Sequence, residues 1–185
     1  MHEKDAQIID LIKADHSFDR GFEMLVIQYQ EPLYWHIRRM VHIHEDADDV
    51  IQNTFIKVFK NIKSFKGESK LYTWLYRIAS NEAISFLNKK KKKQFSNLDE
   101  ELGVLENSLK SDPFFDADEA QLNLIKAIET LPEKQKQVFT LRYFDEMSYK
   151  DISETLDVSV GALKASFHHA IKKIEHYLKQ SLDYV

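Results

Sequence analysis

The chain has 185 residues, of which 43% are hydrophobic and 30% are charged, and its formal net charge is −4. This length can bury one ordinary hydrophobic core or two small ones. The sequence has no cysteine, no signal-like apolar segment near Met1 and no run close to the roughly 20 apolar residues of a membrane span. These absences exclude a secreted disulfide scaffold and an integral membrane protein, and we expect a cytoplasmic protein.

Composition also indicates the fold class and the number of domains. Only four glycines and three prolines are present, and no stretch sustains the period-2 alternation of strands, so we expect an all-α fold. The net charge is +3 over residues 1–93, −7 over 94–119 and zero over 120–185. We therefore expect two small helical domains, 1–93 and 119–185, joined by a flexible acidic linker at 94–118. The negative total argues against a general DNA-coating protein, because sequence-independent affinity comes from neutralising phosphates.

Residues 1–44 are predicted to form short helices, which pack with the two longer helices that follow into one bundle. Apolar residues at 8–12 indicate a first helix. Ser17 or Asp19 is a candidate N-cap for a second helix through 22–29. Pro32 is expected to end or kink that helix, because proline lacks the N–H that an interior helical position donates.

Residues 46–62 predict an amphipathic helix with one unusual residue on its outer face. Its buried stripe at helical spacing is Val50, Ile51, Thr54, Phe55, Val58, Phe59 and Ile62. The opposite face carries acids and amides but also Ile56. A core-facing stripe does not explain Ile56, which points to a partner surface.

Residues 69–87 predict a second long helix, which follows a polar break containing Gly67. One side is apolar, whereas Tyr72, Thr73, Tyr76, Arg77 and Asn81 mark another side. Aromatic rings beside cations are suited to unstacked nucleobases. The alternative is that the two tyrosines are half-buried, with satisfied hydroxyls. The five lysines at 89–93 either form a solvated run that complements the helix C-terminus or contact backbone phosphates.

The ordered segments DADDVIQNTF and FKGESKLYTWLYRIASNEAISFL resemble region 2 of bacterial RNA polymerase sigma factors, in the extracytoplasmic-function group of the sigma-70 family. The resemblance implies that the 46–62 helix binds core RNA polymerase, against the clamp helices of its largest subunit, through Asp46, Asp49, Gln52, Asn53 and Ile56. It also implies that the following turn and helix hold the opened non-template strand of the minus-ten promoter element. The residues implied there are Phe65, Lys66, Lys70, Tyr72, Thr73, Tyr76, Arg77 and Asn81.

Residues 94–118 have no clear amphipathic periodicity and are richer than the preceding segment in acids, serine, glycine and proline. Fully extended, these 25 residues reach at most roughly 80–90 Å, which exceeds two turns of B-DNA at about 35 Å each. A linker of this length can therefore span the distance between two DNA contacts on one promoter. The resemblance implies that this linker threads the polymerase near the active-site and RNA-exit channels. The alternative is a disordered tether whose acids keep it solvated.

The last third of the chain predicts four helices, at about 117–130, 133–144, 149–156 and 160–181. Pro132 marks a helix start. Ser148 and Asp151 form a capping-box pattern in which Asp replaces the usual Glu, and Ser159 can cap the last helix. The spacing of the last two helices is that of a helix-turn-helix.

The segment LPEKQKQVFTLRYFDEMSYKDISETLDVSVGALKASFHHAIKKI resembles region 4 of the same sigma factor group. The resemblance implies that the 160–181 helix reads the minus-thirty-five promoter element. Its candidates are Lys164, Ser166, His168 and His169 at base edges, with Lys172 and Lys173 on phosphate. Many family members carry arginine where this chain has Ser166 and His169, so bidentate arginine reading of guanine is unavailable at those positions.

The resemblance therefore implies a transcription initiation factor. Such a subunit binds core polymerase, selects promoters, helps to open the duplex and performs no catalysis itself, and an anti-sigma factor is its expected regulator. No cofactor is implied. Two alternatives stay open from the residues: a dimeric helix-turn-helix repressor, and a metal-dependent hydrolase that uses the cluster His42, His44, Glu45, Asp46, Asp48 and Asp49.

Overall fold

The computed structural model describes residues 3–91, 98–111 and 118–182, and every regular element in those ranges is helical. The chain divides into two compact units. The N-terminal unit comprises residues 1–41 and 45–89, and the C-terminal unit comprises 42–44 and 90–185. The expectation of an all-α chain with two helical domains is confirmed. No helix among the described residues has the length and apolar composition needed to cross a membrane.

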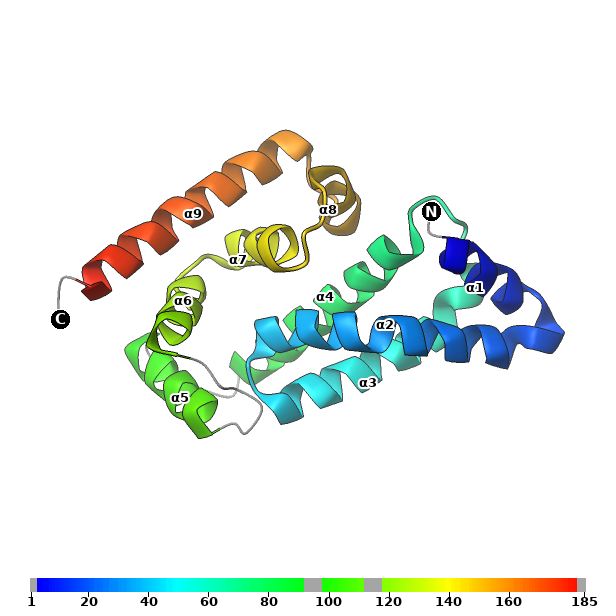
Figure 1. Ribbon diagram of the computed structural model, residues 1–185, viewed down its shortest axis with the longest axis horizontal. Helices are drawn as coiled ribbons and strands as arrows, with labels where there is room; N and C mark the ends of the chain where they lie inside the picture. Colours follow the sequence, from blue (N-terminus) through cyan, green and yellow to red (C-terminus); the bar gives the residue numbers. More distant parts are fainter. Residues whose placement is uncertain (1–2, 92–97, 112–117, 183–185) are drawn as a thin grey trace. The chain divides into compact units, whose positions relative to one another are not determined.

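The N-terminal unit packs three long helices and one short one around an aliphatic core, and Figure 1 shows the course of these helices. They are α1 (Glu3–Lys13), α2 (Phe18–Val41), α3 (His44–Asn61) and α4 (Leu71–Lys91), with 3₁₀ turns at Asp15–Ser17 and Ile62–Ser64. The helix α1 docks on α2, where the hydroxyl of Tyr29 donates to the buried carboxylate of Asp5 at 2.7 Å. A buried hydrogen bond of 2.9 Å between His36 and Ser80 ties α2 to α4. The core is built from Ile8, Ile12, Leu25, Leu33, Ile37, Val58, Leu71 and Leu75.

Pro32 was expected to end or to kink its helix, and the first of these outcomes is wrong, because α2 continues through Pro32 to Val41. Tyr29, Leu33 and Ile37 are buried at helical spacing on both sides of the proline, so packing supports the helix across it. Pro32 itself is exposed, and it has no N–H to donate to the Gln28 carbonyl.

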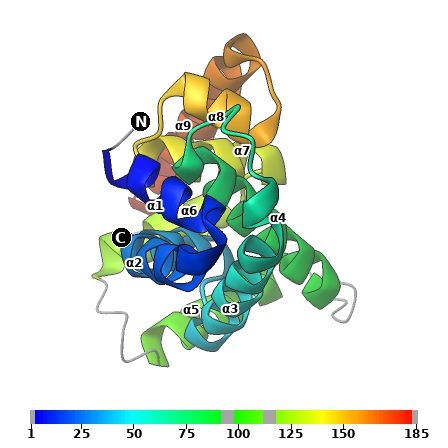
Figure 2. The same ribbon diagram turned by 90° about the vertical axis from the view of Figure 1, so that its right-hand side faces the viewer.

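The C-terminal unit arranges short helices against one long helix (Figures 1 and 2). Its elements are α5 (Leu98–Ser111), α6 (Glu119–Glu129), α7 (Glu133–Phe139), a π-helical turn at Thr140–Phe144, α8 (Tyr149–Leu156) and α9 (Val160–Leu182). The helices α6, α7 and α8 all contact α9. The core between them contains Ala127, Ile128, Leu131, Phe139, Ala170 and Ile174.

The segment expected to be a linker without helical period contains α5, so that expectation is wrong for Leu98–Ser111. Leu102, Leu105 and Leu109 recur at helical spacing, and Leu109 is buried. Their stripe is interrupted in the sequence by acids and by Gly103, which obscures the period. The rest of the expected linker, residues 94–97 and 112–117, lies outside the described residues, as do Lys92 and Lys93 of the lysine run.

Candidate functional site

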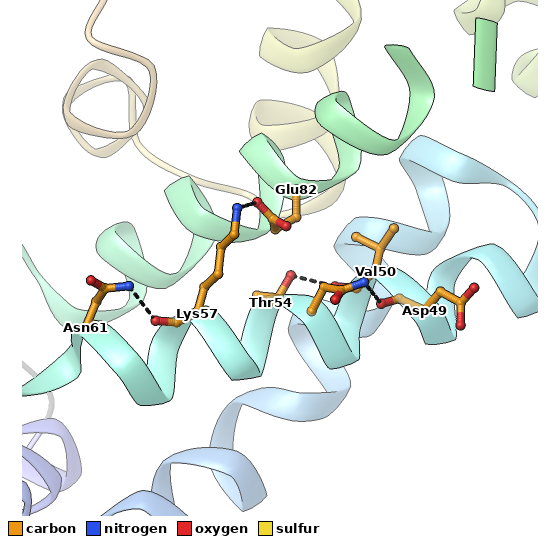
Figure 3. Close-up of polar contacts among 7 residues, drawn as sticks. Asp49, Val50, Thr54, Lys57, Asn61 and Glu82 are labelled. Atoms are coloured by element: carbon orange, nitrogen blue, oxygen red, sulfur yellow. Dashed lines mark hydrogen bonds and ion pairs between the residues drawn. The ribbon is translucent and has the colours of Figure 1, made fainter. Parts of the chain in front are cut away.

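The outward face of α3 carries most of the residues predicted to contact polymerase. Asp49, Gln52, Asn53 and Ile56 are exposed, whereas Asp46 is half-buried. Figure 3 shows polar contacts of α3: the Thr54 hydroxyl donates to the Val50 carbonyl of the same helix at 2.8 Å, and Lys57 forms an ion pair with Glu82 of α4. The Lys57–Glu82 pair thus joins α3 to α4 next to this face.

An open groove of about 840 Å³ runs between α2 and α3 and includes part of this face. Its apolar lining is Phe22, Val26, Tyr34, Ile51, Phe55, Ile56 and Phe59, and its polar lining is Gln30, Glu31, Asp48, Gln52 and Lys60. Phe59, expected in the buried stripe, is 50% exposed, close to the 51% of Ile56. Its ring meets Phe18 and Phe22 edge-on at 5.3 and 5.0 Å between centroids. The exposed apolar surface on the outer face of α3 is therefore larger than the sequence predicted, because it includes Phe59 as well as Ile56.

The residues predicted for the minus-ten strand separate into exposed and buried groups. Lys66, Lys70, Arg77 and Asn81 are exposed and Tyr72 is half-buried, with the Lys70 ammonium 5.4 Å from the centroid of the Tyr72 ring. Gly67 in the preceding turn has a φ of 77°, a left-handed conformation that glycine adopts without strain.

Phe65, Thr73 and Tyr76 are buried and face the unit's interior. Phe65 packs on Trp74 with centroids 5.4 Å apart, and Tyr76 packs on His36 at 4.9 Å. These two rings therefore stabilise the bundle, and a direct contact with DNA would require them to move. The hydroxyl of Thr73 has no hydrogen-bond partner among the described residues.

The predicted helix-turn-helix is formed by α8, a tight turn and α9. Ser148 caps α8, because its hydroxyl accepts from the Asp151 N–H at 3.1 Å and donates to the Asp151 carboxylate at 2.6 Å. Asp157 ends α8 with a φ of 55°, and Ser159 then accepts from the Ala162 N–H at 3.3 Å. The N-caps predicted at Ser148 and Ser159 are confirmed.

On α9, Lys164, His168, His169, Lys172 and Lys173 are exposed and Ser166 is half-buried. A groove of about 420 Å³ brings His169, Lys172 and Lys173 together with Thr130, His176, Tyr177 and Gln180. Lys164 lies outside this groove. No ion pair found among the described residues neutralises Lys164, Lys172 or Lys173, so this face of α9 keeps its positive charge.

The sequence analysis missed Tyr149, whose ring lies near Lys164, and Arg142, which lies near the same ring. The guanidinium of Arg142 lies 5.3 Å from the centroid of the Tyr149 ring, and the Lys164 ammonium lies 5.9 Å from the same centroid. Arg142 belongs to the π-helical turn, whose wider hydrogen bonding shifts side-chain positions away from the 3.6-residue period. Helical spacing could not have predicted its contact with Tyr149.

The metal-site alternative gains no support from the geometry. Within the described ranges, no three histidine or carboxylate side chains come together as the ligands of an ion would.

Comparison with known proteins identifies the family. The RNA polymerase sigma-H factor of Pseudomonas aeruginosa is 30% identical to this chain, over 97% of the chain and 96% of the relative. This chain belongs to the sigma-70 family of RNA polymerase sigma factors. The sigma factor's residues 25–93 match the family described as Sigma-70 region 2, and its residues 121–174 match Sigma-70, region 4. The ECF RNA polymerase sigma-E factor of Haemophilus influenzae is 33% identical over 86% of the chain and 88% of the relative, which places this sigma factor in the extracytoplasmic-function group.

Solved structures show the same fold. The structure of CnrH in complex with the cytosolic domain of CnrY matches with a TM-score of 0.71 at 19% identity, covering 96% of this sigma factor and 99% of that chain. The sigma factor RpoE of Bartonella quintana, in complex with the anti-sigma factor NepR, matches with a TM-score of 0.68 at 22% identity, covering 86% and 98%. Proteins of this family act as initiation factors rather than as enzymes.

Proposed function

We propose that this sigma factor binds core RNA polymerase, directs it to promoters through minus-ten and minus-thirty-five elements, and promotes opening of the duplex. The observation that carries the proposal is the order of the two family regions, each of which falls mainly within its own helical unit. One chain thus holds two surfaces suited to two separate DNA elements. A net charge of −4 fits a protein that depends on a larger partner to hold it on DNA.

The proposed polymerase contact is the outer face of α3 and its groove with α2. Exposed Ile56 and Phe59 supply apolar area, and Asp49 adds an exposed acid on the same helix. A hydrophobic centre bordered by polar residues is the usual composition of a protein interface. Asp46 is a weaker member of this set because it is half-buried.

The proposed minus-ten surface is the exposed part of the turn and of α4. Lys70 beside Tyr72, with Arg77 and Asn81 further along α4, combines an aromatic face with cations, which single-stranded DNA requires. The proposed minus-thirty-five surface is α9, whose first turns present Lys164 to base edges while Lys172 and Lys173 contact phosphates.

We further propose that residues 94–118, including α5, lie along the nucleic-acid channels of the polymerase. The net charge of −7 over 94–119 suits surroundings that attract nucleic acid and are therefore positive. An anti-sigma factor is the proposed regulator, since the fold is shared with a sigma factor that was solved in complex with one. The proposed place of action is the cytoplasm.

Reconstituted transcription tests this function. Purified core polymerase with and without this sigma factor is incubated with genomic DNA, and the 5′ ends of the transcripts are sequenced. We expect start sites that require the sigma factor and share sequence elements about 10 and 35 base pairs upstream. The absence of such starts would contradict the proposal, as would a dimer that binds a palindrome without polymerase, which is the behaviour of a repressor.

A further inference from the structure

The Tyr149 ring has two cations close to it at the start of the helix-turn-helix. Arg142, from the π-helical turn, places its guanidinium carbon 5.3 Å from the ring centroid, and Lys164, from α9, places its ammonium at 5.9 Å. Both distances fall within the roughly 6 Å over which a cation is attracted to an aromatic face. Tyr149 therefore links two segments that are 22 residues apart.

The ring is held in place from several directions. Tyr149 is the first residue of α8, directly after the Ser148 cap, so its backbone is fixed. Its ring meets Phe167 of α9 edge-on at 6.3 Å, and Phe167 in turn stacks on buried Phe139 at 5.9 Å. A ring fixed in this way provides a rigid platform for a mobile side chain.

The two cations differ in how firmly they are held. Arg142 also donates from Nη1 to the Met147 carbonyl at 3.0 Å, which fixes its guanidinium across the turn. Lys164 is exposed, and the Tyr149 ring is the contact found for its ammonium among the described residues. A lysine side chain has many rotamers, so an aromatic neighbour that favours one of them reduces the entropy lost when the ammonium binds.

We propose that Tyr149 is a positioning residue for minus-thirty-five recognition. Its ring holds the Lys164 ammonium where the first turns of α9 meet base edges, and it keeps Arg142 beside that site for a neighbouring phosphate. This inference rests on the proposed function, because it deepens the role of Lys164 there. In helix-turn-helix proteins the start of the second helix reads bases while the first helix crosses the backbone, which matches the positions of Lys164 and Tyr149.

The test measures binding of the reconstituted holoenzyme to promoters that differ only in the minus-thirty-five element. The variants are Tyr149→Leu, Tyr149→Phe, Lys164→Met and the double variant Tyr149→Leu with Lys164→Met. Tyr149→Leu should lower the preference for the best element over its single-base variants by about two- to fivefold, the usual effect of one exposed cation–π contact. Tyr149→Phe, which retains the ring, should retain the preference.

The double variant separates positioning from a merely structural role. If the ring acts through Lys164, adding Tyr149→Leu to Lys164→Met should change the preference no further. Tyr143→Leu is a matched control, because Tyr143 is a 54% exposed aromatic of the same unit and no cation–π contact is found for it among the described residues. It should leave the preference unchanged.

Three results would overturn the inference. They are a uniform loss of affinity for all elements in Tyr149→Leu, additive effects in the double variant, and an unchanged preference in Lys164→Met. The last variant alters an exposed side chain, so it stays informative even if Tyr149→Leu does not fold. A wild-type holoenzyme with no minus-thirty-five preference would instead overturn the proposed function, whereas a normal preference that is insensitive to Tyr149 would overturn this inference alone.

Discussion

A single glycine sets how closely α1 approaches α2. A Cβ atom at Gly21 would lie 2.8 Å from the backbone nitrogen of Ile12 and 2.9 Å from the Leu11 Cβ, so the backbone of α1 would have to move. We expect Gly21→Ala to cost about 1–3 kcal/mol of stability, the usual cost of overpacking. For a chain of this size, the melting temperature measured by circular dichroism should fall by roughly 2–12 °C.

Gly103→Ala is the control for that substitution. Nothing lies within 4 Å of a Cβ at Gly103 in α5, and alanine favours a helix over glycine by about 0.5–1 kcal/mol. Its melting temperature should be unchanged or slightly raised. An unaffected Gly21→Ala variant would show that α1 does not dock as described.

The two tyrosines predicted to contact the minus-ten strand should have separable effects. Tyr72 is half-buried, whereas Tyr76 is 8% exposed and packs on His36. We expect Tyr72→Ala to reduce permanganate reactivity of the opened promoter at unchanged thermal stability, because one base loses a stacking partner worth about 1–3 kcal/mol. Tyr76→Ala should lower stability by about 3 kcal/mol, as large-to-small changes in a core do. Normal promoter opening by Tyr72→Ala would contradict the assignment.

The contrast between Tyr72 and Tyr76 shows what helical spacing could and could not predict about this site. The spacing correctly predicted a helix and a mixed aromatic and basic side. It could not show that Thr73 and Tyr76 face the interior, because their burial depends on packing within the N-terminal unit, as the contact of Tyr76 with His36 of α2 shows. Arg142 was missed for a similar reason, since its place beside Tyr149 follows from a π-helical turn.

The outer face of α3 yields a prediction about assembly with polymerase. Asp49→Lys reverses an exposed charge there without touching the core. We expect affinity for core polymerase, measured by fluorescence anisotropy, to fall about three- to tenfold while the melting temperature stays constant. Asp10→Lys is the matched control, because it changes an exposed acid to lysine on α1, outside the proposed polymerase contacts. Equal affinities of the two variants would contradict the assignment of α3.

The docking of α5 on α6 should depend on pH. Glu106 accepts a hydrogen bond from Lys110 at 2.6 Å and pairs with Lys126 of α6, and these contacts, that of Lys110 foremost, lower the Glu106 pKa to about 2. A lowered pKa in the folded state stabilises the docked form above the ordinary carboxyl pKa of about 4.3, and this contribution is lost as the pH falls toward 2. The effect is small because the side chain is partly exposed.

Hydrogen exchange of the α5 amides measures this docking. We expect protection to be constant between pH 7 and about 5 and to fall below about pH 4. Glu106→Gln should show the reduced protection already at pH 7. Wild-type protection in that variant would show that the ion pair does not hold α5.

Among the elements, most helices could be predicted from periodicity and capping. Two features could not: the helix α5 and the course of α2 at Pro32. The α8–α9 pair was predictable because Ser148 and Ser159 mark its helix starts. The helix α5 was missed because acids and Gly103 interrupt its leucine stripe. The sequence left open whether α2 ends at Pro32, because the tertiary burial of Leu33 and Ile37, which outweighs the local cost of proline, is not visible in it.

At the level of the whole molecule, a small net charge accompanies the two proposed DNA-binding surfaces. The total charge of −4 disfavours autonomous binding to DNA, while cations are concentrated along α4 and α9. This distribution fits a subunit that contributes specificity while polymerase supplies much of the affinity. It also separates the sigma factor from a repressor, which must hold its operator alone.

Binding of holoenzyme to a randomised promoter library is the most direct test of the two-surface account. The wild type is compared with Arg77→Ala on α4 and Lys164→Ala on α9, and bound sequences are read by deep sequencing. The account predicts that Arg77→Ala changes base preference only near position minus ten and Lys164→Ala only near minus thirty-five. Changes by both variants at the same positions, or a wild-type preference confined to one element, would contradict it.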